Sequence, residues 1–161
     1  MIWIRADANK EIGTGHVMRC LSIAAELAAL GQQVRFLVAD ESAVPLLEAK
    51  GQDYRILHSD YRNPEAEWKQ LEAVTGVRKQ WSKGRKDFFL ADSYFVTPEY
   101  FERIRQYMPV GYVDDKAEVP FALDLLINYN IFADASLYEG QEARLILGPE
   151  YAPLREEFRQ V

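Results

Sequence analysis

The stretch IGTGHVMR, from Ile12 to Arg19, brings together residues that could handle a phosphate or a proton. Gly13 and Gly15 flank Thr14, and glycine lets the backbone approach a ligand closely and tolerates positive φ. His16 follows at once, where an apolar helical pattern begins. A histidine at a helix start lies beside unpaired N–H groups and the positive end of the helix dipole. That setting favours a neutral imidazole, which makes His16 a candidate general base.

Two other interpretations of these glycines can be tested on the sequence. A dinucleotide-binding fingerprint, G-x-G-x-x-G after a first strand, would use Gly13 and Gly15, with Asp40 near the end of a second strand. Met18 occupies the third glycine position, however, and residues 7–12 form a longer link than that tight turn allows. A P-loop is excluded because no Gly-Lys-Ser/Thr follows. Taken alone, the stretch still leaves open a histidine that merely caps or packs.

The hydrophobic pattern predicts short apolar strands that alternate with helices. The expected strands cover residues 2–6, 34–39, 54–57, 87–91, 110–113, 123–127 and 144–147. The expected helices cover residues 15–30, 42–50, 63–81 and 98–107, and a further helix starts at residue 151. Strands this apolar require a parallel sheet covered on both faces. We therefore expect an α/β fold with a Rossmann-like, doubly wound parallel sheet over residues 1–150.

In such a fold, ligands bind beyond the carboxyl ends of the strands. Polar residues and glycines gather at these predicted ends: Asp7, Gly13, Gly15, His16, Asp92, Tyr94, Asp114, Asp115, Asn128 and Asn130. Thr14 and Arg19 lie beside them in the sequence and join the expected substrate contacts. For Asp114 and Asp115 the alternative is that loop carboxylates cap a turn. No metal site is expected, because no ligand spacing connects the other histidine, His58, to His16, and no cofactor is expected.

Composition narrows the class of protein further. The net charge of −6 over 161 residues argues against non-specific nucleic-acid binding. A basic cluster is expected to be the solvated end of a helix; it comprises Arg78, Lys79, Lys83, Arg85 and Lys86. The lone Cys20 excludes an internal disulfide, suits a reducing compartment and is expected to be buried. Without a membrane-spanning apolar run or a signal peptide, the sequence predicts a cytoplasmic protein.

Six motifs in order give a specific resemblance: IRADANKEIGTGHVMRC, ADSY, VDD, DLLINYN, YEG and GPEYAPLREEF. Together they resemble the family of the UDP-sugar hydrolase of pseudaminic acid biosynthesis and related spore-coat polysaccharide biosynthesis proteins. That family is built on the GT-B glycosyltransferase plan. The resemblance implies that residues 1–150 are the N-terminal half of a GT-B fold. It implies that residues 151–161 begin the linker to a C-terminal UDP-binding domain, which would be the partner of this half.

The resemblance also implies a reaction. The substrate would be UDP-2,4-diacetamido-2,4,6-trideoxy-β-L-altropyranose, and water would displace UDP at the anomeric carbon with inversion. His16 matches the family's water-activating histidine, and Tyr94 matches its active-site tyrosine in the D-x-Y motif. One base can suffice here, because a nucleoside diphosphate leaves without the protonation that an alcohol needs.

The remaining polar positions receive roles that are compatible with this chemistry. Gly13, Gly15 and the helix N-terminus could meet the departing phosphate, and Asn128 and Asn130 could hydrogen-bond the acetamido groups. Two alternatives stay open. One is a glycosyltransferase of surface or spore-coat polysaccharide synthesis, in which an acceptor hydroxyl replaces water. The other is a sugar-binding half-domain without catalysis.

Overall fold

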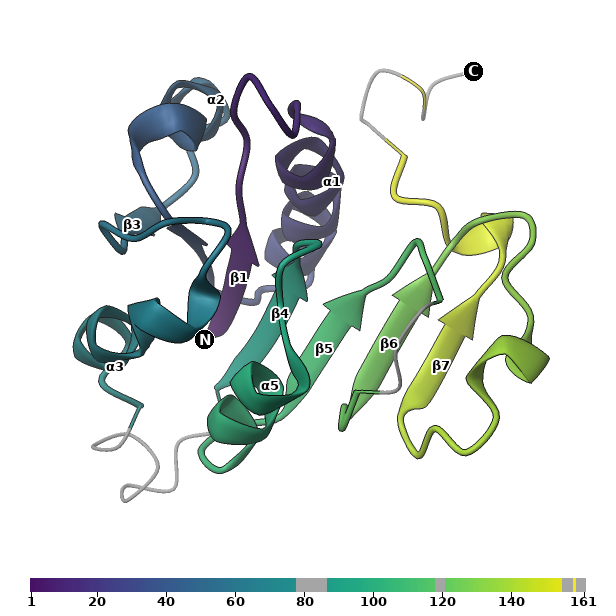
Figure 1. Ribbon diagram of the computed structural model, residues 1–161. Helices are drawn as coiled ribbons and strands as arrows, with labels where there is room; N and C mark the ends of the chain where they lie inside the picture. The colour runs from purple at the N-terminus through teal and green to yellow at the C-terminus, as the bar shows by residue number, and fades with distance from the viewer. Residues whose placement is uncertain (78–86, 118–120, 155–157, 159–161) are drawn as a thin grey trace.

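The computed structural model describes residues 1–77, 87–117, 121–154 and 158. Its strands form one parallel sheet of seven strands in the order β3-β2-β1-β4-β5-β6-β7 (Figure 1). This is the strand order of the doubly wound Rossmann fold with a seventh strand added, so the predicted fold class is confirmed. The strands are β1 Ile2–Ala6, β2 Val34–Val38, β3 Tyr54–Ile56, β4 Phe88–Asp92, β5 Val110–Val113, β6 Leu125–Asn128 and β7 Arg144–Leu147.

Helices cover the two faces of the sheet. On one face lie α1 (Gly15–Ala29) and α2 (Val44–Ala49), and on the other lie α3 (Trp68–Thr75) and α5 (Pro98–Arg105) (Figure 1). Consecutive residues of a strand point to opposite faces, so Trp3 joins the core under α3 and α5, whereas Ile4 joins the core under α1 and α2. Short 3-10 helices complete the described structure: η1 Glu41–Ala43, η2 Pro64–Glu67, η3 Ala135–Tyr138 and η4 Pro149–Tyr151.

The predicted helix over residues 63–81 is not one continuous helix. The segment begins as η2, continues as α3, and stops at Gly76, whose φ of 61° places it in the left-handed conformation that commonly ends helices. Residues 78–81 and the basic cluster over residues 78–86 lie outside the described ranges. Of the helix expected from Tyr151 onwards, residues 152–154 are not helical and most of the remainder is also outside those ranges.

The strand order reverses between β1 and β4. From β1 the chain builds β2 and β3 on one side, and it then crosses back to place β4 on the other side of β1. The loops that follow β1 and β4 therefore diverge, and this divergence creates the ligand crevice of such folds.

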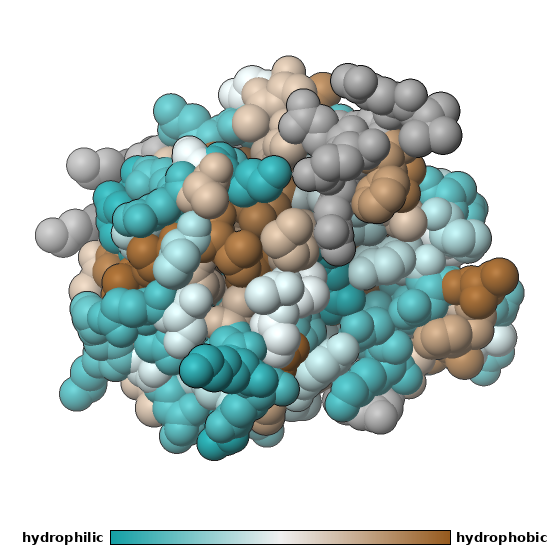
Figure 2. Space-filling model, turned by 90° about the horizontal axis from the view of Figure 1, so that it is seen from above, coloured by the Kyte–Doolittle hydropathy of each residue, from teal (hydrophilic) through white to brown (hydrophobic). Residues whose placement is uncertain are grey.

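Figure 2 is seen from above, onto the carboxyl edge of the sheet, and shows hydrophobic groups exposed among hydrophilic ones. Within the described ranges, no helix combines the length and apolarity that crossing a membrane requires.

Candidate functional site

His16 and Asp92 meet where the strand order reverses. His16 follows the loop after β1, and Asp92 is the last residue of β4. The Nδ1 of His16 lies 2.5 Å from Oδ1 of Asp92, and both residues are buried, His16 with 5% of its surface exposed. Assigning the Nδ1 proton to this contact leaves Nε2 of a neutral imidazole as a proton acceptor. A carboxylate that orients an imidazole in this way is a common arrangement for a general base.

A short, hydrogen-bonded turn delivers His16 to this position. Asn9 and Gly13 exchange backbone hydrogen bonds of 3.2 and 2.9 Å, and Gly13 adopts a φ of 72°. The side-chain oxygen of Asn9 accepts hydrogen bonds from the N–H groups of Glu11 (2.8 Å) and Ile12 (3.0 Å). Helix α1 then begins with no side-chain cap on its first N–H groups. His16 therefore lies in the first helical turn, as the sequence predicts.

Arg19, one turn further along α1, holds the carboxylate of Asp92 from the other side. Its Nε and Nη2 groups donate hydrogen bonds to the two oxygens of Asp92. Its Nη1 group donates to Asp115 (2.8 Å) and to the hydroxyl of Tyr129 (3.1 Å). Most of the N–H donors of the guanidinium thus hydrogen-bond to acceptors of the protein itself. Arg19 fixes Asp92, and through it the ring of His16, in addition to lining the pocket described below.

The environment of Asp92 keeps its carboxyl group ionised. Burial by itself would raise the pKa of Asp92, but hydrogen bonds from Arg19 and His16 outweigh burial and lower it. Cys20 also lies here, with Sγ donating to Asp92 at 3.4 Å, and burial followed by the Asp92 charge raises the pKa of this thiol. The cysteine is fully buried, as the sequence predicts. Asp92 is accordingly the anion around which the site is organised.

We expect the stability of the fold to depend on Asp92 at acidic pH. Because its pKa is lower in the folded state than the unfolded value of about 3.9, the ionised carboxylate stabilises the fold above that value. This contribution is lost as the pH falls toward the lowered pKa. Urea midpoints measured in steps from neutral to acidic pH should show this loss in the wild type. An Asp92→Asn variant should lack this part of the dependence of the urea midpoint on pH. An identical pH dependence in both proteins would contradict the assignment.

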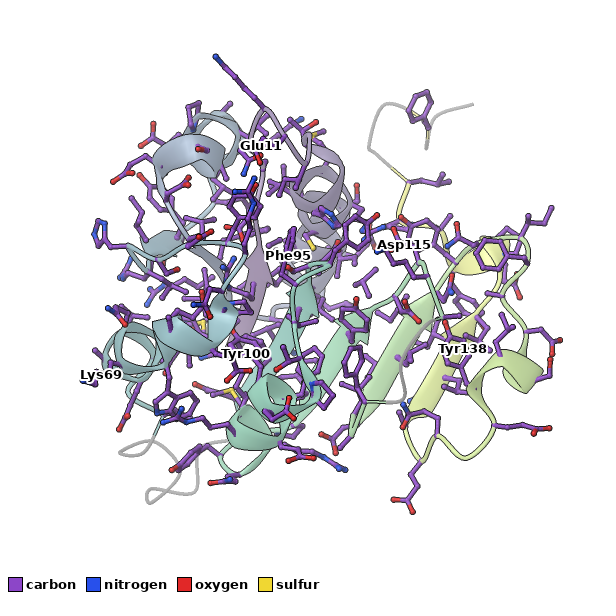
Figure 3. The ribbon with its side chains drawn as sticks, in the orientation of Figure 1. Glu11, Lys69, Phe95, Tyr100, Asp115 and Tyr138 are labelled. Atoms are coloured by element: carbon purple, nitrogen blue, oxygen red, sulfur yellow. The ribbon has the colours of Figure 1, made fainter. Side chains whose placement is uncertain are left out.

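Tyr94 and Asp115 form the rim of the site. The ring of Tyr94 is edge-on to His16 with 4.5 Å between ring centroids, and its hydroxyl donates to Asp115 at 3.0 Å. Burial and this hydrogen bond both raise the pKa of Tyr94, so it is a protonated donor at neutral pH. With 44% of its surface exposed, Tyr94 is also open to a ligand. Figure 3 shows Asp115 at the carboxyl edge of the sheet.

A pocket of about 250 Å³ opens at the N-terminal end of α1. It combines the glycine loop with a segment that follows β7, and its polar groups include the guanidinium of Arg19. Met18 forms part of its wall, at the position where a dinucleotide fingerprint would carry glycine. The residues that line the pocket are Thr14, Gly15, Met18, Arg19, Tyr129, Ala152 and Pro153.

The two glycines of the loop should respond differently to alanine. Gly13 has a φ of 72°, so Gly13→Ala should lower the free energy of unfolding by about 1–2 kcal/mol, the cost of a left-handed L-residue. Gly15 has no such φ and nothing within 4 Å of an added Cβ, so Gly15→Ala should leave stability unchanged or slightly raised. Denaturant midpoints compare the two variants directly. Equal losses would show that the loop conformation does not depend on Gly13.

Three predicted substrate contacts are engaged with the protein itself at the ends of β5 and β6. Asp114 accepts hydrogen bonds from the backbone N–H groups of residues 116 and 117, and it also accepts one from the hydroxyl of Tyr138 (2.8 Å). Asn128 donates to the same hydroxyl at 2.8 Å and accepts from Asn130 at 2.9 Å. Asp114 therefore caps a turn, which was the alternative left open for it, whereas Asp115 reaches the site. Figure 3 shows Tyr138 below the edge on which Asp115 lies.

Asp7 belongs to a buried ionic network beneath the loop. Arg5 donates to Asp7 and, with Nε and Nη2, to both oxygens of Glu67 at 2.9 Å. Tyr100 of α5 also donates to Glu67 at 2.6 Å. Asp7 accepts the N–H of Ala39 at 2.7 Å, which ties the ends of β1 and β2 together. In this structure Asp7 anchors the start of the glycine loop.

Sequence reasoning missed four contributors to the site and its support. Tyr129 follows β6 and could have been found as a polar residue at a strand's carboxyl end. Arg5 and Glu67 carried no such signal, because one lies within an apolar strand and the other within a charged helical segment. Lys116, which lies over the ring of Tyr94, was also overlooked.

Comparison with family models and with curated proteins identifies no relative of this chain. No family model matches the chain, and a search of curated proteins finds no significant match. Within the described ranges, no three His, Cys, Asp or Glu side chains are grouped so that they could hold a metal ion. The fold and site together define a Rossmann-like α/β protein with a carboxylate–histidine pair at its topological switch point.

Proposed function

We propose that the chain is the sugar-side domain of a nucleotide-sugar hydrolase that removes UDP from a diacetamido-trideoxy sugar. The observation that carries this proposal is the His16–Asp92 pair in the crevice at the switch point, with a pocket at the start of the same helix. Proteins with this sheet topology bind ligands in that crevice. The six sequence motifs support the choice of substrate class, because two of them contain His16 and Asp92.

In the proposed reaction, a water oxygen bonds to the anomeric carbon as the bond from that carbon to the diphosphate oxygen breaks. The electron pair of the broken bond leaves with UDP, and the proton of the water passes to Nε2 of His16. A single displacement of this kind inverts the anomeric centre. Asp92 holds the ring so that Nε2 can accept the proton.

The proposal includes a partner and a setting. A second domain of the GT-B type would supply most of the UDP site, and the pocket at the start of α1 would face it. The exposed apolar side chains Ile131, Phe132 and Tyr151 are compatible with such a neighbour. A cytoplasmic setting, where nucleotide sugars are made, agrees with the free buried thiol of Cys20.

The test is UDP release from the UDP-linked diacetamido sugar, measured for this chain and for the full-length product of its gene. Proton NMR at early times identifies the anomer released, and inversion is expected. Transfer of the sugar to an added alcohol in preference to water would assign a glycosyltransferase instead. Binding of the sugar nucleotide without any turnover by the full-length product would leave only a sugar-binding role and would contradict hydrolysis.

A further inference from the structure

The pocket at the start of α1 contains two hydroxyl groups that have hydrogen-bonding capacity to spare. Tyr129 lines the pocket, and its hydroxyl accepts a hydrogen bond from Nη1 of Arg19 at 3.1 Å. Thr14 lines it as well and makes no side-chain hydrogen bond to cap the helix. Among the described residues, neither hydroxyl donates its proton to a protein acceptor. Both hydroxyls can therefore hydrogen-bond a ligand.

The remaining side chains of the pocket are mostly apolar. Met18 comes from α1, and Ala152 and Pro153 come from the segment that follows η4. An amide that carries a methyl group matches this composition, because its carbonyl oxygen accepts a hydrogen bond, its N–H donates one and its methyl packs against apolar groups. The volume of about 250 Å³ is below the roughly 300–1,000 Å³ typical of whole ligands. The pocket therefore suits one substituent of a larger ligand.

A phosphate suits this pocket less well than a neutral amide. Arg19 is the charged side chain of its lining, and each of the three guanidinium nitrogens already donates a hydrogen bond within the protein. A phosphate would have to compete for these donors with the carboxylates of Asp92 and Asp115, which would also repel it. An amide needs no uncompensated cation.

The pocket adjoins the candidate base. Gly15 and Arg19, two of its lining residues, precede and follow His16 along α1, and Nη2 of Arg19 lies 3.2 Å from Nδ1 of His16. We propose that the pocket binds the acetamido group on the carbon next to the anomeric carbon, an inference that rests on the proposed function. Tyr129 is then a specificity-determining residue that donates its hydroxyl proton to the acetamido carbonyl. The hydrogen bond that it accepts from Arg19 strengthens the one that it donates, because linked hydrogen bonds polarise each other.

The test measures whether the protein prefers an acetamido group and whether Tyr129 is responsible. The probes are UDP-N-acetylglucosamine and UDP-glucose, which carry an acetamido group and a hydroxyl, respectively, on the carbon next to the anomeric carbon. In calorimetric titrations the wild type should bind the first more tightly. Tyr129→Phe should weaken binding of UDP-N-acetylglucosamine about 3- to 10-fold, the effect of one hydrogen bond. It should leave the affinity for UDP-glucose unchanged.

Two further variants complete the comparison. Tyr54→Phe is the matched control, because the hydroxyl of Tyr54 also makes one side-chain hydrogen bond, to Glu48 at 2.9 Å, and β3 is the edge strand remote from β6. This variant should match the wild type with both probes. Ala152→Leu adds bulk to the apolar wall of the pocket, so it should reduce the preference for UDP-N-acetylglucosamine without removing a hydrogen bond.

Each outcome bears on one of the two proposals. Equal affinity of the wild type for both probes, binding of neither, or equal weakening of both by Tyr129→Phe would overturn the acetamido pocket. An unchanged preference in Ala152→Leu, or an equal loss in Tyr54→Phe, would overturn it as well. Hydrolysis that depends on His16, together with an unchanged preference in Tyr129→Phe, would leave the proposed function standing alone. A preference that depends on Tyr129, without cleavage of the UDP-linked diacetamido sugar, would retain the pocket and reject the hydrolase.

Discussion

Replacing His16 by alanine is expected to lower the rate of UDP release by about 10²- to 10⁴-fold, the usual contribution of a positioned general base. The imidazole is the group in the crevice whose Nδ1 is held by a buried carboxylate, which leaves Nε2 to accept a proton. Without it, Asp92 remains bound by Arg19 and offers no proton acceptor of comparable basicity. The measurement is steady-state UDP release at saturating substrate.

His58→Ala provides the matched control for this experiment. His58 is the other histidine of the chain, its side chain is 73% exposed, and it lies 3.9 Å from Glu41, away from the site. Its replacement should leave the rate unchanged. Because His16 is buried, its replacement could disturb the fold. Thermal unfolding should therefore be used to confirm that the His16→Ala variant is folded. A folded His16→Ala variant with wild-type turnover would eliminate the assignment of the base.

Replacing Arg5 by methionine should be strongly destabilising, by about 3–5 kcal/mol in the free energy of unfolding, because it leaves buried carboxylates without their cation. Arg5 is 2% exposed, Asp7 6% and Glu67 0%, so water cannot take over the role of the guanidinium. The buried environment alone would lower the pKa of Arg5, but the charges of Asp7 and Glu67 raise it, so the arginine is always charged. Urea denaturation at neutral pH measures the loss.

Arg55→Met serves as the comparison, since Arg55 forms an exposed ion pair with Asp53 at 3.3 Å. Exposed pairs of this kind contribute about 0–1 kcal/mol, so this variant should remain close to the wild type. Adding Glu67→Gln to Arg5→Met should recover part of the lost stability by removing one uncompensated buried charge. Equal losses in Arg5→Met and Arg55→Met would show that the buried network contributes no more than a surface pair.

Local patterns were sufficient to predict most of the fold. The strands Ile2–Ala6, Val110–Val113 and Arg144–Leu147 have the predicted bounds, and α1 ends just before Gly31, as expected. The alternation of apolar strands with helices predicted the parallel sheet, because such strands must be covered on both faces. The prediction of one continuous helix over residues 63–81 was wrong, because the left-handed backbone of Gly76 ends α3.

The partners of the site residues could not be predicted in the same way. The sequence identified His16 and Asp92 separately, and only the pairing of β1 with β4 brings them together. Asp7 and Asp114 have the residue type and position of ligand contacts, yet each is engaged by the protein itself. Arg5 and the turn at residues 116 and 117 are near them in the chain, whereas the N–H of Ala39 and the hydroxyl of Tyr138 come from other elements. No local pattern encodes the contacts with these distant elements.

The crossover from β3 back to β4 has a consequence for the order of folding events. The His16–Asp92 contact joins residues 76 positions apart, on the two sides of that crossover. A nascent chain that has emerged only as far as β3 carries the histidine without its carboxylate. Contacts of such long sequence separation form late and slowly. Ligand binding at this crevice would therefore report on completion of the central sheet, and it would distinguish native molecules from compact intermediates that already contain α1.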